Sequence, residues 1–139
     1  MSILWPVVAL AGWTFAVLLL IPIARIRAAR QGRVKSRDFA YGESADVPGD
    51  VSLPNRNFMN LLEMPVLFYV ACILFYVTAR TDPAAVALAW TYVGLRVAHS
   101  AIHLTYNRVF HRLLAFALSV FVLVTLWIHL ARALSQLSA

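Results

Sequence analysis

The stretch "NRNFMNLLEMP", residues 55–65, decides the fold class because it leads from a polar loop directly into an apolar run. It places Arg56, Asn60 and Glu63 at or just inside a segment that we predict to cross a membrane. On a helix with 100° per residue, these three side chains fall within a sector of about 60° and form one polar stripe. Charge is costly inside a membrane, so the stripe should face protein or water.

The composition of the whole chain agrees with a membrane protein. Of its 139 residues, 62% are hydrophobic and only 13% are charged, which is far from the balance of soluble domains. The one cysteine, Cys72, lies in an apolar run, so a disulfide framework and a Cys/His metal site are both excluded. We expect Cys72 to be a small buried hydrophobic residue.

Four apolar segments, at residues 3–24, 58–79, 83–107 and 110–134, are each about long enough to cross a bilayer as a helix. The first lacks a basic leader, so we expect it to be a retained span. Backbone polar groups in lipid must be satisfied within each segment. The sequence therefore predicts an all-α integral membrane protein: a four-transmembrane-helix bundle with one domain, residues 1–139.

The distribution of basic residues predicts the orientation. Seven of the twelve lie in the long connection at residues 25–57, and Arg108 and Arg112 flank the last turn. The positive-inside rule then places both termini outside and the 25–57 loop in the cytosol. We expect a bacterial inner membrane protein.

The third segment carries a second polar face, with Arg96 near its middle. Its polar and aromatic residues fall within about 100° of one another: Tyr92, Arg96, His99, His103, Tyr106 and Asn107. Glu63 is the only acidic residue in the four segments and is the natural partner for Arg96 or Arg56. An ion pair between helices would explain both.

The arginines outnumber that single carboxylate. Arg56, Arg96, Arg108 and Arg112 all fall at or near the cytosolic ends of the last three segments. An excess of arginine in a partly buried cleft indicates an anion site.

The histidines raise the alternative of a haem protein. His99 and His103 are four residues apart, but one helix cannot supply both axial ligands of a haem in this way. We expect His111 and His129 to lie at the membrane interfaces.

These residues resemble those of the MAPEG family, the membrane-associated proteins in eicosanoid and glutathione metabolism. The second span of that family carries Arg-x-x-x-Asn-x-x-Glu followed by Pro, matched here by Arg56, Asn60, Glu63 and Pro65. The spacing of its microsomal glutathione transferases is matched in "RVAHSAIHLTYNRVFHRLLAF", which contains Arg96, His99 and Arg112. The first span and its loop match only in character.

The resemblance implies a homotrimer of four-helix protomers that binds glutathione between neighbouring protomers near the cytosolic face. It implies that glutathione is gripped by five residues: Arg56, Asn60, Glu63, Arg96 and His99. It also implies that Arg112 stabilises the glutathione thiolate. A guanidinium near the sulfur lowers the thiol pKa, which provides a nucleophile at neutral pH.

The sequence departs from the transferase pattern at Ala98 and His103, where those relatives have tyrosines. His103 is then a catalytic candidate, as a hydrogen-bond donor to the bound peptide or as a base toward its thiol. In the first loop, Arg25, Arg27 or Arg30 could reach a glutathione carboxylate of the adjacent protomer.

Two functions from different classes follow. The first is a glutathione transferase or peroxidase that acts on lipophilic electrophiles or lipid hydroperoxides, with glutathione as co-substrate. The alternative is a non-catalytic accessory subunit of a larger membrane complex, or a lipid-binding protein with the same fold. A small transporter that uses Glu63 as its proton site is disfavoured by the nearby arginines. Seven of the twelve basic residues lie in the 25–57 loop, so we interpret the net positive charge of the chain as a topology signal and not as a nucleic-acid-binding surface.

Overall fold

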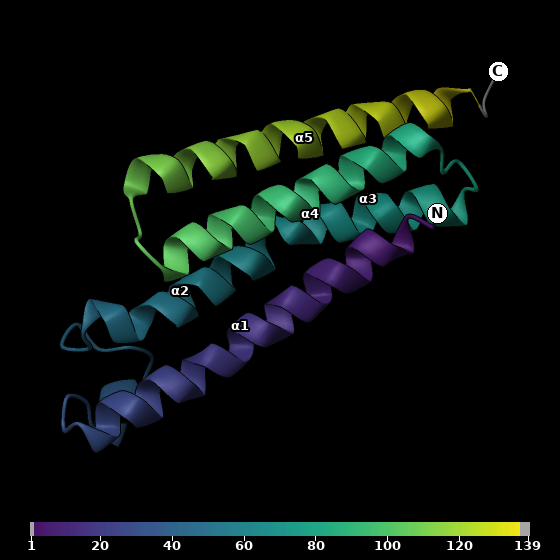
Figure 1. The fold of residues 1–139 in the computed structure, drawn as a ribbon. Helices are drawn as coiled ribbons and strands as arrows, with labels where there is room; N and C mark the ends of the chain where they lie inside the picture. Colours follow the sequence, from purple (N-terminus) through teal and green to yellow (C-terminus); the bar gives the residue numbers. More distant parts are fainter. Residues whose placement is uncertain (1, 137–139) are drawn as a thin grey trace.

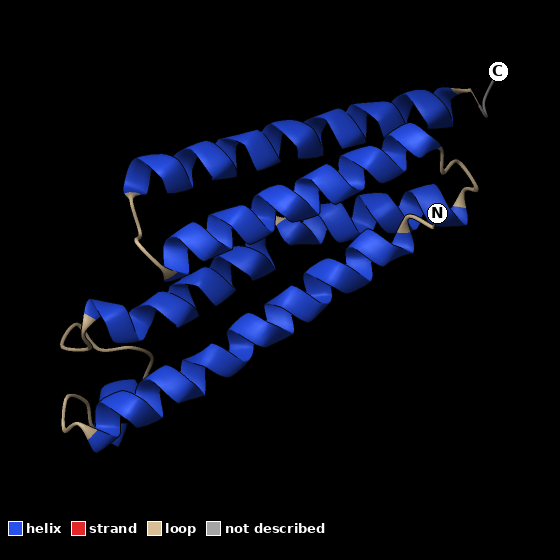
Figure 2. Cartoon of the chain, viewed as in Figure 1, coloured by secondary structure: helices blue, strands red, loops and turns tan. Residues whose placement is uncertain are grey.

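The computed structural model describes residues 2–136, and this part of the chain is helical with no strand (Figure 2). The main helices run antiparallel as a bundle, and the start of α1 and the end of α5 lie at the same end of it (Figure 1). In chain order the elements are α1 (Leu4–Arg30), the 3-10 turn η1 (Ser36–Phe39), α2 (Gly49–Glu63), α3 (Pro65–Val77), α4 (Pro83–Leu104) and α5 (Val109–Ser135).

Four helical stretches are long and apolar enough to cross a membrane, which confirms the predicted number of spans. The second, Gly49–Val77, is divided into α2 and α3 at Met64. Pro65 causes the break, because its ring nitrogen has no hydrogen to donate to the preceding turn. Met64 itself keeps α-helical dihedrals (φ -62°, ψ -34°), so α2 and α3 remain in helical register across this junction.

The first connection is shorter than the predicted 25–57 loop, because the flanking helices extend into it. Helix α1 continues to Arg30, so Arg25, Arg27 and Arg30 lie on its last two turns. It ends where Gly32 adopts a left-handed conformation at φ 69° and the Arg33 amide donates to the Ala28 carbonyl, a common helix terminator. Helix α2 begins at Gly49, nine residues before the predicted second span.

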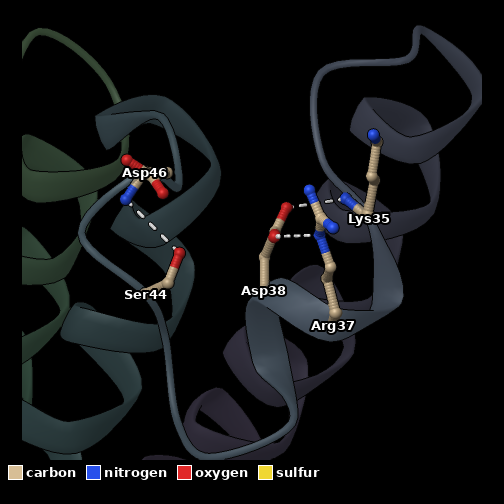
Figure 3. A network of polar contacts seen from close by, with 5 residues as sticks. All are labelled: Lys35, Arg37, Asp38, Ser44 and Asp46. Carbon is tan, nitrogen blue, oxygen red and sulfur yellow. Dashed lines mark hydrogen bonds and ion pairs between the residues drawn. The ribbon is translucent and has the colours of Figure 1, made fainter.

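The remaining connection is held by its own hydrogen bonds. The Lys35 amide donates to the Asp38 carboxylate at 2.8 Å, and the Asp46 amide donates to the Ser44 hydroxyl at 3.3 Å (Figure 3). Arg25 extends from α1 to Glu43 at 3.0 Å and lies over the Phe39 ring. These contacts fix the loop against the end of α1.

The apolar core lies in the middle of the bundle and toward the chain termini. Phe68 of α3 stacks on Tyr92 of α4 with ring centroids 4.6 Å apart, and Leu10, Leu126 and Leu130 are also buried. Cys72 is fully buried, as predicted. This core joins all four spans at the end of the bundle away from the long loop.

Asp82 links two helices at the termini end. One oxygen of its carboxylate accepts from the Ala85 amide at 2.7 Å and so caps α4, while the other lies 2.9 Å from His129 Nε2 on α5. His129 therefore has a defined partner. The Ala85 amide, and then His129, lower the pKa of Asp82 below its usual value.

Replacing Asp82 tests this cap. Asp82→Ala should lower the free energy of unfolding by about 1 kcal/mol, the usual value of a helix N-cap. Because the folded-state pKa is lowered, the stabilisation should be complete above pH ~4 and lost as the pH falls through that lower pKa. Thermal unfolding in detergent, followed by circular dichroism across acidic pH, measures both effects.

Asp82→Asn is the matched control, since asparagine caps a helix about as well but carries no charge. It should retain most of the stability and lose the acid dependence. An equal loss in both variants would show that the contact with His129, and not the cap, stabilises this end.

Candidate functional site

A pocket of about 390 Å³ opens at the loop end of the bundle, between α2, α4 and the start of α5. This volume is within the range of small-molecule sites, roughly 300–1,000 Å³. Its lining contains two arginines, two histidines and two asparagines and no carboxylate: Leu53, Arg56, Asn60, His99, His103, Asn107, Val109, Arg112, Leu113 and Phe116.

Helix α4 presents two buried histidines to this pocket. The His99 ring nitrogen Nδ1 lies 3.1 Å from the Arg112 carbonyl oxygen. A carbonyl can only accept, so Nδ1 carries the proton and the neutral ring has an acceptor at Nε2. His99 Nε2 and both ring nitrogens of His103 are buried and have no hydrogen-bond partner among the described residues. These nitrogens therefore keep unused hydrogen-bonding capacity in the pocket wall.

The start of α5 adds positive charge to the same pocket. Arg112 lies in the first turn and donates from Nη1 to the Asn107 side-chain oxygen at 2.8 Å. No side chain caps this helix, so its first amides keep the partial positive charge of a helix N-terminus. Asn107 adopts a left-handed conformation at φ 46°, which asparagine tolerates better than most residues. Guanidinium and helix terminus both favour a bound anion.

Arg96 lies directly behind the pocket wall and does not line it. Its side chain is fully buried, donates from Nη2 to the Asn60 carbonyl, and lies 5.6 Å from the centroid of the Phe116 ring. Its Nε and Nη1 atoms find no partner in the part of the chain that the structure describes. Arg96 thus connects α4 to wall residues of α2 and α5.

A buried hydrogen bond that the sequence analysis missed supports this region. Asn57 of α2 donates to the Ser100 hydroxyl of α4 at 2.5 Å, and both side chains are fully buried. The signal was in the sequence: Asn57 is four residues before Leu61 and eleven before Phe68, which lie on the same core-facing side. Polar residues at such positions need an internal partner.

The structure brings together five of the predicted site residues and separates others from them. Those in the pocket are Arg56, Asn60, His99, His103 and Arg112. Arg96 supports the wall, while Arg108 and Ala98 are exposed and outside the pocket. The departure at Ala98 therefore does not alter this pocket, whereas His103 is part of it.

Glu63 lies apart from the other two members of the predicted polar stripe. It is exposed at the last residue of α2, does not line the pocket, and makes no ion pair with Arg56 or Arg96 within residues 2–136. The physical reason is that Arg96 turns inward to a backbone carbonyl, which satisfies one of its donors without a carboxylate. An ion pair between Glu63 and either arginine, one explanation offered by the sequence, is therefore not formed among the residues that the structure describes.

The arrangement is suited to an anionic ligand with hydrogen-bonding groups. Arg56 and Arg112 supply fixed positive charge, and the Asn60 and Asn107 side chains supply amide groups. Because no carboxylate lines the pocket, this charge is not neutralised there.

The comparisons with known proteins give a family. The model of the MAPEG family matches residues 3–132, nearly the whole chain. Neither a search of curated proteins nor a search of solved structures finds a match. Four helices able to span a membrane fit the integral membrane proteins of this family, which includes glutathione transferases and related proteins. The chain belongs to the MAPEG family.

Proposed function

We propose that this protein is a membrane-bound glutathione transferase or peroxidase, which activates the glutathione thiol toward lipophilic electrophiles or lipid hydroperoxides. The observation that carries the proposal is a pocket with two guanidinium groups, no carboxylate, and three buried histidine nitrogens that have no hydrogen-bond partner within residues 2–136. Glutathione offers two carboxylates, two amides and a thiol, which match these groups in charge and hydrogen bonding.

Arg112 is the proposed thiolate-stabilising residue. Its guanidinium lies at the positive end of α5, so both the side chain and the helix favour a negative sulfur. The thiolate then attacks the electrophilic carbon, a sulfur–carbon bond forms, and the leaving group departs with its electron pair. The thiol proton passes to water or to a neighbouring base. Orientation and a lowered thiol pKa are sufficient for this reaction.

His103 is the residue that we expect to hold the sulfur or its proton. Its ring is buried beside His99, with centroids 6.0 Å apart, and neither nitrogen is engaged. An imidazole can donate a hydrogen bond from one nitrogen and accept one at the other. His103 therefore takes the place of the tyrosine hydroxyl that the transferase resemblance implies at this position.

A homotrimer with the site between protomers is part of the proposal, and exposed Glu63 supports it. Met59, Leu62 and Val66 around it are exposed and apolar, as lipid-facing residues are. A carboxylate on such a surface is costly unless another protein surface covers it. The glutathione ammonium also lacks an acidic partner in the pocket of a single chain. A neighbouring protomer would cover Glu63 and could supply the acidic partner of the ammonium.

The proposed orientation puts the pocket and the long loop in the cytosol, where glutathione is abundant. The pocket lies at the same end as Arg25, Arg27 and Arg30 of α1, which the positive-inside rule keeps inside. We place the protein in a bacterial inner membrane on this basis.

Arg112→Gln tests the thiolate role. On addition of glutathione, the wild-type protein should gain ultraviolet thiolate absorbance and conjugate a chlorinated nitrobenzene. The variant should lose thiolate at neutral pH on the order of tenfold, because the thiol pKa returns toward its ordinary value. Difference spectroscopy and the conjugation rate of purified protein give the two readouts.

Arg108→Gln is the matched control, because it also removes one positive charge. Arg108 lies four residues before Arg112, is exposed and does not line the pocket. The Arg108→Gln variant should behave as wild type. Equal losses in both variants would point to net charge alone, and the absence of any glutathione-dependent thermal shift in the wild type would refute the proposal.

His103 is tested by two replacements. His103→Phe removes both nitrogens and should reduce kcat/KM roughly tenfold, the value of about one hydrogen bond to a reacting group. His103→Tyr restores an O–H donor and should recover most of that loss. The glutathione-dependent thermal shift, measured in parallel, separates binding from chemistry; equally inactive Phe and Tyr variants would exclude a simple donor role.

The second candidate function is a non-catalytic accessory subunit or lipid-binding protein on the same fold. The observation that favours it is His103 itself, where the resemblance implies a tyrosine. A protein that gives no glutathione-dependent thermal shift and copurifies stoichiometrically with another membrane complex would support this alternative.

A further inference from the structure

A second hollow lies on the other side of α2, between its first turns and the end of α1. Its volume is about 470 Å³, and its lining changes character along α1. Leu20 and Ile23 form the part nearer the middle of the span, while Arg27, Gln31 and Arg33 form the part nearer the loop. The hollow shares no lining residue with the candidate glutathione pocket of the same chain.

A shallower hollow of about 440 Å³ adjoins the first one along α1. The two share Ile23, Arg27 and Gln31, and Ile26 and Arg30 complete the second. Each is apolar on the span side and polar on the loop side. Arg27 therefore lines both hollows, and each of them extends from Arg27 along apolar residues toward the middle of the span.

The charge at this position is only partly compensated. Arg33 donates to the Asp50 carboxylate at 2.6 Å, so that pair is neutral. Arg27 and Arg30 make no ion pair with any described residue of the chain. The two hollows therefore present two uncompensated guanidiniums, Arg27 and Arg30, next to the Arg33 guanidinium that Asp50 holds in place.

The depth of this position matches the head-group layer. Helix α1 has 27 residues and is about 40 Å long, about 10 Å more than the hydrocarbon core. Leu19, Leu20, Ile23 and Ile26 are exposed and apolar, and Arg27 and Arg30 follow in the next turn. The change from lipid-facing to cationic surface thus falls inside the two hollows.

We propose that this groove binds an anionic glycerophospholipid. The lipid phosphate lies against Arg27 and Gln31, and one acyl chain follows each of the two hollows past Ile23. The negative phosphate matches the uncompensated guanidiniums of Arg27 and Arg30, and two apolar grooves match two acyl chains. Basic pockets between membrane helices on the cytoplasmic side are known to bind anionic head groups.

The test uses the full chain in vesicles of equimolar phosphatidylglycerol and phosphatidylcholine. After mild detergent extraction, native mass spectrometry measures the ratio of the two lipids retained per chain. Wild type should retain phosphatidylglycerol preferentially, and Arg27→Gln should reduce that preference roughly fivefold, the effect of about one basic side chain at a membrane surface. Arg132→Gln, exposed near the opposite end of the bundle, is the control for net charge and should match wild type.

Asp50→Asn supplies a test of opposite sign. It frees the charge of Arg33 and should increase phosphatidylglycerol retention, and it costs little because exposed ion pairs contribute little stability. It also keeps the proposal testable if Arg27→Gln folds poorly.

Several outcomes would overturn the proposal. They are no preference in the wild type, equal losses in Arg27→Gln and Arg132→Gln, and no gain in Asp50→Asn. Retention of glycerol phosphate alone as strongly as of the lipid would indicate an ion site instead. A changed oligomeric mass in Arg27→Gln with unchanged lipid retention would assign the face to a second copy of the chain.

Discussion

The burial of one guanidinium is the constraint on which the loop end of this bundle depends. The Arg96 side chain is fully buried between helices, on a helix that is long and apolar enough to span a membrane. An unsatisfied charge is costly at such a position. The contacts of Arg96 with the Asn60 carbonyl and the Phe116 ring set α2 and α5 against α4. The walls of the pocket are therefore positioned by a residue that does not line it.

The two ends of the bundle use different interactions. Toward the termini, aromatic and aliphatic side chains such as Phe68 and Leu126 fill the space between spans, and Asp82 fixes the start of α4. Toward the loop, the Asn57–Ser100 bond and Arg96 replace part of that apolar packing. Buried polar contacts are directional, whereas apolar packing is not. Directional contacts are therefore concentrated beside the candidate pocket.

The sequence was sufficient for the spans and for one face of the site. Hydrophobic length predicted four crossings, and helical periodicity predicted that Arg96, His99 and His103 share a face; all three are buried. The start of α2 at Gly49 was missed because its first turns are polar and carry no membrane signal. Hydropathy detects lipid contact, and this part of α2 packs mainly against α1 and the loop.

The position of Glu63 relative to Arg56 and Asn60 was not predictable from their spacing. A common 60° sector states that the three side chains are neighbours on α2. The sector does not show which of these side chains lie inside the contact of α2 with α4 and α5. The boundary of that contact depends on the angle at which the helices cross. In the structure this boundary runs between Asn60, which lines the pocket, and Glu63, which does not.

An exposed carboxylate beside Met59 and Leu62 also has a thermodynamic consequence for the membrane around it. If another protein surface covers Glu63, the stability of each chain depends on how many copies share a given area of bilayer. Dilution with lipid then acts as a denaturant of the assembly without any change in temperature or pH. A sparsely expressed chain would then leave the Glu63 carboxylate facing lipid.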